Sequence, residues 1–262
     1  MERIVPGSTR DMTSLRAMLR NAARDLLYPG LDLHTRNRAS LRRFWRTGAR
    51  DLLDAGSGNG YFSWLAYRSG ARVVALNLEP TQVEQARDYL IGHRRADPRR
   101  LRFETANLYA LSREQRRFDE IICYEVLEHL DHDDEVVAQF YRILRPGGVL
   151  HVCCPNARHP RHLAEVLDPH EAGGHVRPGY TAERYRALLE PAGFAIRDMV
   201  GIGPVGLYYA DSLLRAVRNR LGDVFALPLL PLALPFVWTA SFDPPTPFSL
   251  YVRAEKPECA VS

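Results

Sequence analysis

The chain has 262 residues, of which 46% are hydrophobic and 25% charged, and its formal net charge is a modest +4. A chain of this size can bury one large core, and no internal repeat or low-complexity linker divides it into two. We therefore predict a single domain over residues 1–262. The four cysteines lack the spacing of metal ligands, which favours buried free thiols over disulfides or a metal cluster. No apolar signal-peptide run opens the sequence, so we predict a cytoplasmic protein.

Residues 1–46 are expected to form a helical N-terminal cover. Residues 13–27 place apolar side chains at helical spacing with three arginines off the stripe, which predicts an amphipathic helix. Another helical segment is expected at 34–45. Residues 1–50 hold 11 Arg against 4 acidic residues, so the basic excess of the chain lies at this end.

Residues 51–80 predict a strand, a glycine turn, a helix and a second strand. An apolar run at 51–55 is long enough for one buried strand, glycines follow at 56–60, helical spacing resumes at 61–68, and 72–76 is apolar again. Such a unit implies a parallel sheet. Its turn presents backbone N–H groups and a helix N-terminus at the carboxyl edge of the sheet, where we expect a polar or anionic ligand.

The glycine spacing of this turn narrows the choice of ligand. A dinucleotide fingerprint, Gly-x-Gly-x-x-Gly, would need its third glycine where Tyr61 stands, so that interpretation fails. The pattern present, Asp54-x-Gly56-x-Gly58-x-Gly60, resembles the first motif of the class I S-adenosylmethionine-dependent methyltransferases. Taken alone, the motif also fits a turn without a ligand.

Later stretches extend the resemblance over residues 51–156. A strand is predicted at 101–105, and another at 118–123 leads into the run YEVLEH; the run RILRPGG then precedes a strand at 149–154. The chain is identified as a member of this family and is similar to the ubiquinone-type O-methyltransferases. Membership implies an α/β fold, a Rossmann-like doubly wound sheet of seven strands with the last one antiparallel. It also implies S-adenosylmethionine as the cofactor, bound by a core of residues 47–156.

The resemblance implies cofactor-binding residues at the ends of four strands and on the cover. They are Asp54, Gly56, Ser57, Gly58, Gly60 and Phe62, then Asn77, Leu78 and Gln82, then Asn107 and Leu108, then Tyr124 and Glu125, with Arg36 for the cofactor carboxylate. Two positions depart from the family, which usually places acids where Asn77 and Asn107 stand. We expect these amides to bind the adenosine without charge. Glu79 either assists Asn77 or caps the helix predicted at 81–93.

Two histidines are candidates for the general base. His129 is the first choice, because histidine titrates near neutrality; a structural role for it is equally open. His175, in a glycine-rich loop, is the rival. Glu125, Glu128 and His129 would share one face of a helical turn, and in ubiquinone-type relatives this sequence is linked to a divalent metal. Other relatives with the pattern need none, so we expect no metal here.

The substrate-side half, residues 157–262, is expected to carry a helix at 181–191 and strands at 195–202 and 248–254. Between these strands lies an insertion, 203–247, with a very apolar run at 224–238. That run is shorter than the roughly 20 residues that span a bilayer, and Pro228, Pro231 and Pro235 are expected to break its helix. We favour a hydrophobic lid over the acceptor pocket; peripheral membrane contact and a homodimer contact are the alternatives.

These features predict O-methylation of a hydroxyl on a small molecule, either a sugar or natural product or a quinone-like phenol. N- or C-methylation of a lipid or natural product is an alternative, and a non-catalytic cofactor-binding partner subunit is another. The fourth strand is not followed by the Asn/Asp/Ser-Pro-Pro-aromatic run of enzymes that methylate base amines. We therefore expect a small-molecule acceptor and no nucleic-acid partner.

Overall fold

The computed structural model describes residues 28, 31–48, 50–164, 166–168, 171, 173–238 and 242–258. The amphipathic helix predicted at 13–27 and one of the four cysteines, Cys259, lie outside these ranges. The other three cysteines are buried free thiols, as predicted. Within the described part of the chain, no helix is both long and apolar enough to cross a membrane.

The centre of the molecule is a seven-stranded sheet in the order β3-β2-β1-β4-β5-β7-β6. Strands β1 to β5 are parallel, and β7 lies antiparallel between β5 and β6, which confirms the predicted fold. The strands are β1 (Asp51–Ala55), β2 (Arg72–Asn77), β3 (Leu101–Thr105), β4 (Phe118–Tyr124), β5 (Leu144–Pro155), β6 (Ala195–Ile202) and β7 (Ser249–Glu255).

Helices cover both faces of the sheet because the inner strands are apolar on both sides. Successive strand residues point to opposite faces, so Leu52 packs in one core with Ala66 while Leu53 packs in the other with Phe140. The first core includes η1 (Ala39–Phe44), α3 (Tyr61–Arg68), α4 (Pro80–Arg87) and η2 (Asp88–His93). The second includes η3 (Leu108–Arg113), η4 (Leu127–His129), α5 (Asp133–Ile143) and α7 (Ala182–Leu189).

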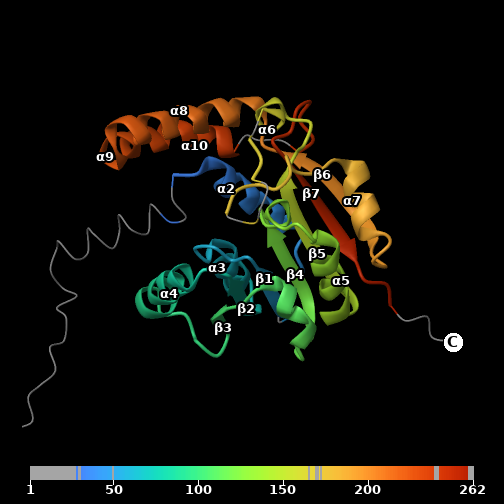
Figure 1. The fold of residues 1–262 in the computed structure, drawn as a ribbon. Helices are drawn as coiled ribbons and strands as arrows, with labels where there is room; N and C mark the ends of the chain where they lie inside the picture. The colour runs from blue at the N-terminus through green and yellow to red at the C-terminus, as the bar shows by residue number, and fades with distance from the viewer. Residues whose placement is uncertain are drawn as a thin grey trace, which may run out of the picture.

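A third layer is built from α2 (Leu33–Arg38) and the insertion. The insertion folds into α8 (Val205–Leu221), α9 (Asp223–Ala226), η5 (Leu227–Leu229) and α10 (Leu230–Trp238). Figure 1 shows α8 and α10 side by side with α2 between them and the sheet. Leu33 of α2 packs with Leu207 and Leu214 of α8 and with Leu230 of α10, which gives this layer a small core of its own.

The expectation that three prolines break this helix is wrong for two of them. Pro228 does coincide with a short 3-10 segment. Pro231, however, stands in the first turn of α10, where a missing N–H costs little, and Pro235 lies inside the same helix. Tertiary packing explains why α10 continues, because Leu230, Ala233 and Val237 are buried in the third core.

Candidate functional site

A cavity of about 730 Å³ lies at the carboxyl edge of the sheet. Its walls come from the turn after β1, the ends of β4 and β5, the helix α2, the short helix α6 (Pro160–Leu163) and one side of α8. Seven of the predicted site residues line it: Gly56, Ser57, Gly58, Phe62, Tyr124, Glu125 and His175. The fold thus brings the glycine motif and one predicted base into one space.

The glycine turn is held by backbone hydrogen bonds and leaves one side open. The N–H groups of Gly56 and Ser57 both donate to the carbonyl of Leu76, at 2.9 and 2.8 Å. Gly56 has a φ of +83°, and a Cβ there would lie 2.3 Å from Cγ2 of Val126. A Cβ on Gly58 would meet nothing within 4 Å, so this glycine faces open space. The turn is therefore packed behind Gly56 and accessible at Gly58.

Asp54 does not line the cavity and instead stabilises the glycine turn from inside the protein. Its side chain is buried and accepts a 2.5 Å hydrogen bond from the hydroxyl of Ser63, which ties β1 to α3. Burial raises the pKa of Asp54 to about 6, although the bond from Ser63 opposes that rise. Gly60 completes the connection, because it is the N-cap of α3 and its N–H donates to the carbonyl of Ser57.

An ion pair between a buried arginine and a partly exposed glutamate joins α2 to the end of β4. Nη2 of Arg38 lies 2.6 Å from Oε2 of Glu125, and only 6% of the Arg38 side chain is exposed. Burial raises the pKa of Glu125, while the charge of Arg38 lowers it. Arg38 lines the cavity and the predicted Arg36 does not. Since His34 and Arg38 are four residues apart on α2 and share its inner side, the helical period could have identified Arg38.

The predicted adenosine residues lie at the ends of β2 and β3, at the same edge but outside the lining of this cavity. Asn77 donates from its amide to Gln82 at 2.8 Å and accepts from the N–H of Leu78 at 2.9 Å. Asn107 caps η3, followed by Leu108, and accepts from Tyr109. Each amide oxygen has a second lone pair for a ligand, and the adenosine contacts of these residues stay predictions. Glu79 caps α4 through the N–H of Thr81.

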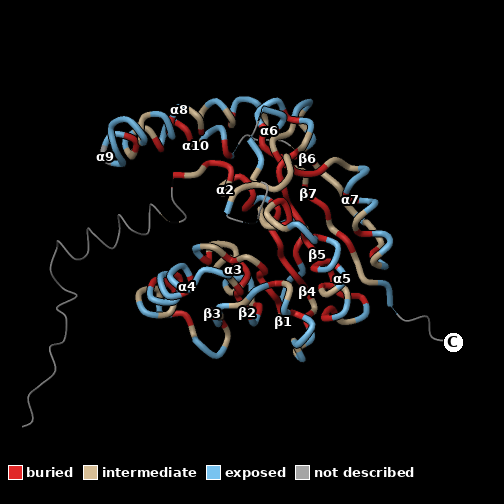
Figure 2. The backbone as a smooth tube through the Cα atoms, viewed as in Figure 1, coloured by how far each residue is buried: buried red, intermediate tan, exposed pale blue. Residues whose placement is uncertain are grey.

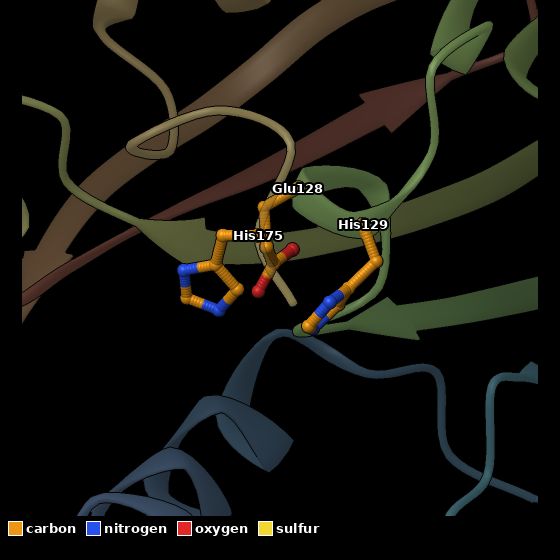
Figure 3. A group of neighbouring side chains, drawn as sticks. All are labelled: Glu128, His129 and His175. Atoms are coloured by element: carbon orange, nitrogen blue, oxygen red, sulfur yellow. The ribbon is translucent and has the colours of Figure 1, made fainter. Parts of the chain in front are cut away.

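His129 and His175 lie against each other beside a buried carboxyl group. Their rings meet edge to face with centroids 4.7 Å apart. Figure 3 shows Glu128 and both imidazoles pointing toward one another, and their ligand atoms all lie within 4.8 Å of each other. The predicted grouping of Glu125, Glu128 and His129 on one helical turn is wrong, because Glu125 has a φ of +55° and the turn begins only at Leu127.

Glu128 itself is fully buried, and neither carboxyl oxygen meets the distance and angle limits of a hydrogen bond with the described residues. Burial, together with the charge of Glu125, holds the pKa of Glu128 well above its ordinary value, although the Cys154 thiol lowers it slightly. The expectation that no metal is used here stays a prediction.

The far end of the cavity is aromatic and was missed by the sequence analysis. The ring of His34 stacks on Phe248 with centroids 3.8 Å apart, and His162 and Tyr208 contact the same phenyl ring at 4.5 and 5.9 Å. Burial, and then the charge of Arg38, lowers the pKa of His34 to about 3, so its imidazole is neutral. These four residues come from four separate segments, and no local pattern connects them.

The sheet, its glycine turn and the cavity define an α/β protein that binds a nucleotide-like cofactor at the carboxyl ends of its strands. Two polar atoms in the lining, Oγ of Ser57 and Oε1 of Glu125, are buried and have no hydrogen-bond partner among the described residues. Together with the open space beside Gly58, they fit the polar amino-acid end of S-adenosylmethionine.

Residues 30–198 match a family described as a methyltransferase domain, and the chain belongs to that family. The chain therefore carries a methyltransferase domain, which agrees with the family that the sequence predicted.

Curated relatives and solved structures agree with this assignment. The chain is 30% identical over 153 residues to a probable S-adenosylmethionine-dependent methyltransferase of Mycolicibacterium smegmatis, covering 57% of this chain and 53% of that one. It is 31% identical over 143 residues to the ubiquinone biosynthesis O-methyltransferase of Xanthomonas oryzae pv. oryzae, covering 54% and 57%. The chain thus spans about half the length of these relatives.

The fold resembles phosphoethanolamine N-methyltransferase 2 of Haemonchus contortus, solved in complex with S-adenosyl-L-methionine. The TM-score is 0.60 at 17% identity, and the match covers 95% of this chain and 59% of that one.

Proposed function

We propose that this methyltransferase O-methylates a hydroxyl group of a small molecule. The observation that carries the proposal is an imidazole in the cavity wall, since His175 lines the cavity with the ion pair of Arg38 and Glu125. A hydroxyl needs a proton acceptor during methylation, whereas a neutral amine does not. The relative from Xanthomonas oryzae, which is named as an O-methyltransferase, supports the same reaction class.

Hydrogen bonds hold the two residues that flank His175 in the chain. The carbonyl of Gly174 lies 2.8 Å from Nδ1 of His129, and the N–H of Val176 donates to the carbonyl of Glu128 at 2.9 Å. The first contact assigns the Nδ1–H tautomer to a neutral His129. Of the two predicted bases, we therefore propose His175 as the proton acceptor and His129 as a positioning residue that holds the His175 loop.

The cavity residues and the cofactor then have separate roles in methyl transfer. When bound, S-adenosylmethionine supplies an electrophilic methyl group on its sulfonium. His175 takes the hydroxyl proton while the acceptor oxygen forms its bond to the methyl carbon and the carbon–sulfur bond breaks. The far end of the cavity is lined by aromatic rings, among them Phe248 and Tyr208. A planar acceptor such as a quinone-like phenol suits that end better than a sugar.

The test is an acceptor screen that measures S-adenosylhomocysteine formed from phenols, sugars and amines. We expect turnover of a phenol, and His175→Ala should lower kcat by about 100-fold or more, the usual contribution of a general base. The affinity for S-adenosylmethionine, measured by calorimetry, should stay unchanged in that variant. His132→Ala, an exposed histidine outside the cavity, is the matched control.

Three outcomes would overturn the proposal. Turnover of amines but not hydroxyls would establish N-methylation, the main alternative. Cofactor binding without turnover of any acceptor would point to a non-catalytic partner subunit. Full activity of His175→Ala on a phenol would remove His175 from the reaction.

A further inference from the structure

The exposed apolar side chains of this protein gather at one end. Of the twelve large hydrophobic residues that are exposed in the described chain, eight belong to the helices α8 to α10. Four of the eight line one groove, and we call these four the outer face: Tyr209, Leu213, Leu232 and Phe236. In Figure 2 the side of α8 that faces away from α2 is coloured mostly as exposed. Leu163, Val166 and Leu167 add three more in or just after α6, next to the start of α8 in Figure 1.

The outer face is hollowed by a groove of about 390 Å³ between α8 and α10. Its lining includes the small residues Gly206, Ala210 and Ala233 together with Leu213 and Leu232. The hydroxyl of Tyr209 is the single polar side-chain group in that lining. Soluble proteins rarely expose so large a contiguous apolar surface unless something binds there.

The internal packing of α8 does not account for this surface. Its side toward α2 buries Leu207 and Leu214 in the third core. Another side contributes Asp211, Ser212 and Arg215 to the cofactor cavity. The outer face is therefore not needed either for the core or for the cavity.

Positive charge borders the outer face. Arg220 stands seven residues beyond Leu213, so it lies on the same side of α8 two turns further along. Arg218, in contrast, stands four residues after the buried Leu214 and so lies on the side of α8 that faces the third core. Asp223, at the start of α9, is an acid at the same end. An apolar face with a basic residue at its border is typical of helices that lie in the interface of a membrane with anionic lipids.

We propose that the outer face docks on an anionic lipid surface, with its leucines and aromatic rings in the interface and Arg220 among the headgroups. A protein partner would use about one hydrogen bond per 100–200 Å² of interface, and the groove offers almost none. Docking also agrees with the absence, in the described chain, of a helix that could cross a bilayer. The proposal goes beyond methyl transfer and does not depend on the acceptor.

The test is flotation of the full chain with vesicles of phosphatidylcholine, alone or mixed with phosphatidylglycerol. We expect binding that is stronger to the mixed vesicles and weaker at high salt. Leu213 and Leu232 are 63% and 72% exposed in the free protein. Leu213→Asp and Leu232→Asp should each lower partitioning to vesicles about tenfold, since each removes a leucine that docking would bury in the lipid interface. Arg220→Gln should lower only the preference for the anionic vesicles.

Gln85→Asp is the control for the added charge in flotation, because Gln85 is exposed on α4 and has no role in the site. It should bind vesicles like the unaltered chain. Recovery of the unaltered chain in the soluble fraction with both vesicles at low salt would overturn the proposal. So would a dimer, seen by light scattering, that Leu213→Asp dissociates while no vesicle binding occurs. Flotation requires no methyl acceptor, so failure of the proposed O-methylation would leave this result intact.

Discussion

Replacing Gly56 by alanine tests the claim that the glycine turn is packed on one side and open on the other. The new Cβ would lie 2.3 Å from Cγ2 of Val126, and the residue would have to keep a φ of +83°. A left-handed conformation costs an alanine about 1–2 kcal/mol, and overpacking costs about 1–3 kcal/mol. We expect Gly56→Ala to lower the free energy of unfolding by about 2–5 kcal/mol in total.

Gly58→Ala is the matched comparison, because it has a positive φ of +51° but no atom within 4 Å of its Cβ. We expect it to lower the free energy of unfolding by only about 1–2 kcal/mol. Its methyl group would instead project into the cavity and lower the affinity for S-adenosylmethionine by about tenfold or more. The two glycines should thus separate stability from cofactor binding.

The assays are guanidinium denaturation followed by circular dichroism and calorimetric titration with S-adenosylmethionine. Adding Val126→Ala to Gly56→Ala should recover about 1–3 kcal/mol relative to the sum of the single changes, because it removes the clash but not the backbone strain. Additive effects would refute the clash as the cause. Equal losses of stability in Gly56→Ala and Gly58→Ala would refute the packing difference itself.

Three further substitutions test contacts that stabilise the fold. Arg38→Gln leaves the partly exposed Glu125 without its partner and should lower the free energy of unfolding by about 1–3 kcal/mol in a denaturant titration. Because the pKa of Asp54 is raised in the folded state, folding is favoured while this carboxyl is protonated. The free energy of unfolding should therefore fall by roughly 3 kcal/mol as the pH rises from 3.8 to about 6. Denaturation of Asp54→Asn at several pH values should not show this decline. Thr181→Ala removes the N-cap of α7 and should lower the free energy of unfolding by about 1 kcal/mol, seen as a lower midpoint of thermal unfolding. An unchanged midpoint would show that the cap contributes nothing.

Most of the sheet was predictable because its strands are short, apolar and separated by turn residues. The strands β1, β3 and β6 and the helix α3 have the residue boundaries that the patterns predicted. Periodicity reports which side chains must be buried, and burial determines these elements. The glycine motif was predictable for a related reason, since Gly56 must accept both a positive φ and the close approach of Val126.

The cavity wall opposite the glycine turn could not be predicted in the same way. Arg38 pairs with Glu125 across 87 positions of sequence, and His34 stacks on Phe248 across 214. Such pairs are decided by how α2 and α8 sit on the sheet, which local patterns do not encode. The left-handed φ of Glu125 has the same origin, because its N–H donates to the carbonyl of Cys153 in the neighbouring strand.

The insertion shows why one role cannot be assigned to a whole apolar segment from its sequence. From the sequence, a lid over the pocket and a docking surface looked like rival uses of the apolar run 224–238. No described residue of that run lines the cavity, so the wall on this side comes from α8 instead. In the structure, one side of α8 supplies Asp211 and Arg215 to the cavity while its other side carries Tyr209 and Leu213 on the outer face. Because a helix presents different residues to each side, closing the pocket and meeting a lipid surface are compatible in one element. A change confined to the outer face should therefore alter vesicle binding and leave the cavity wall in place.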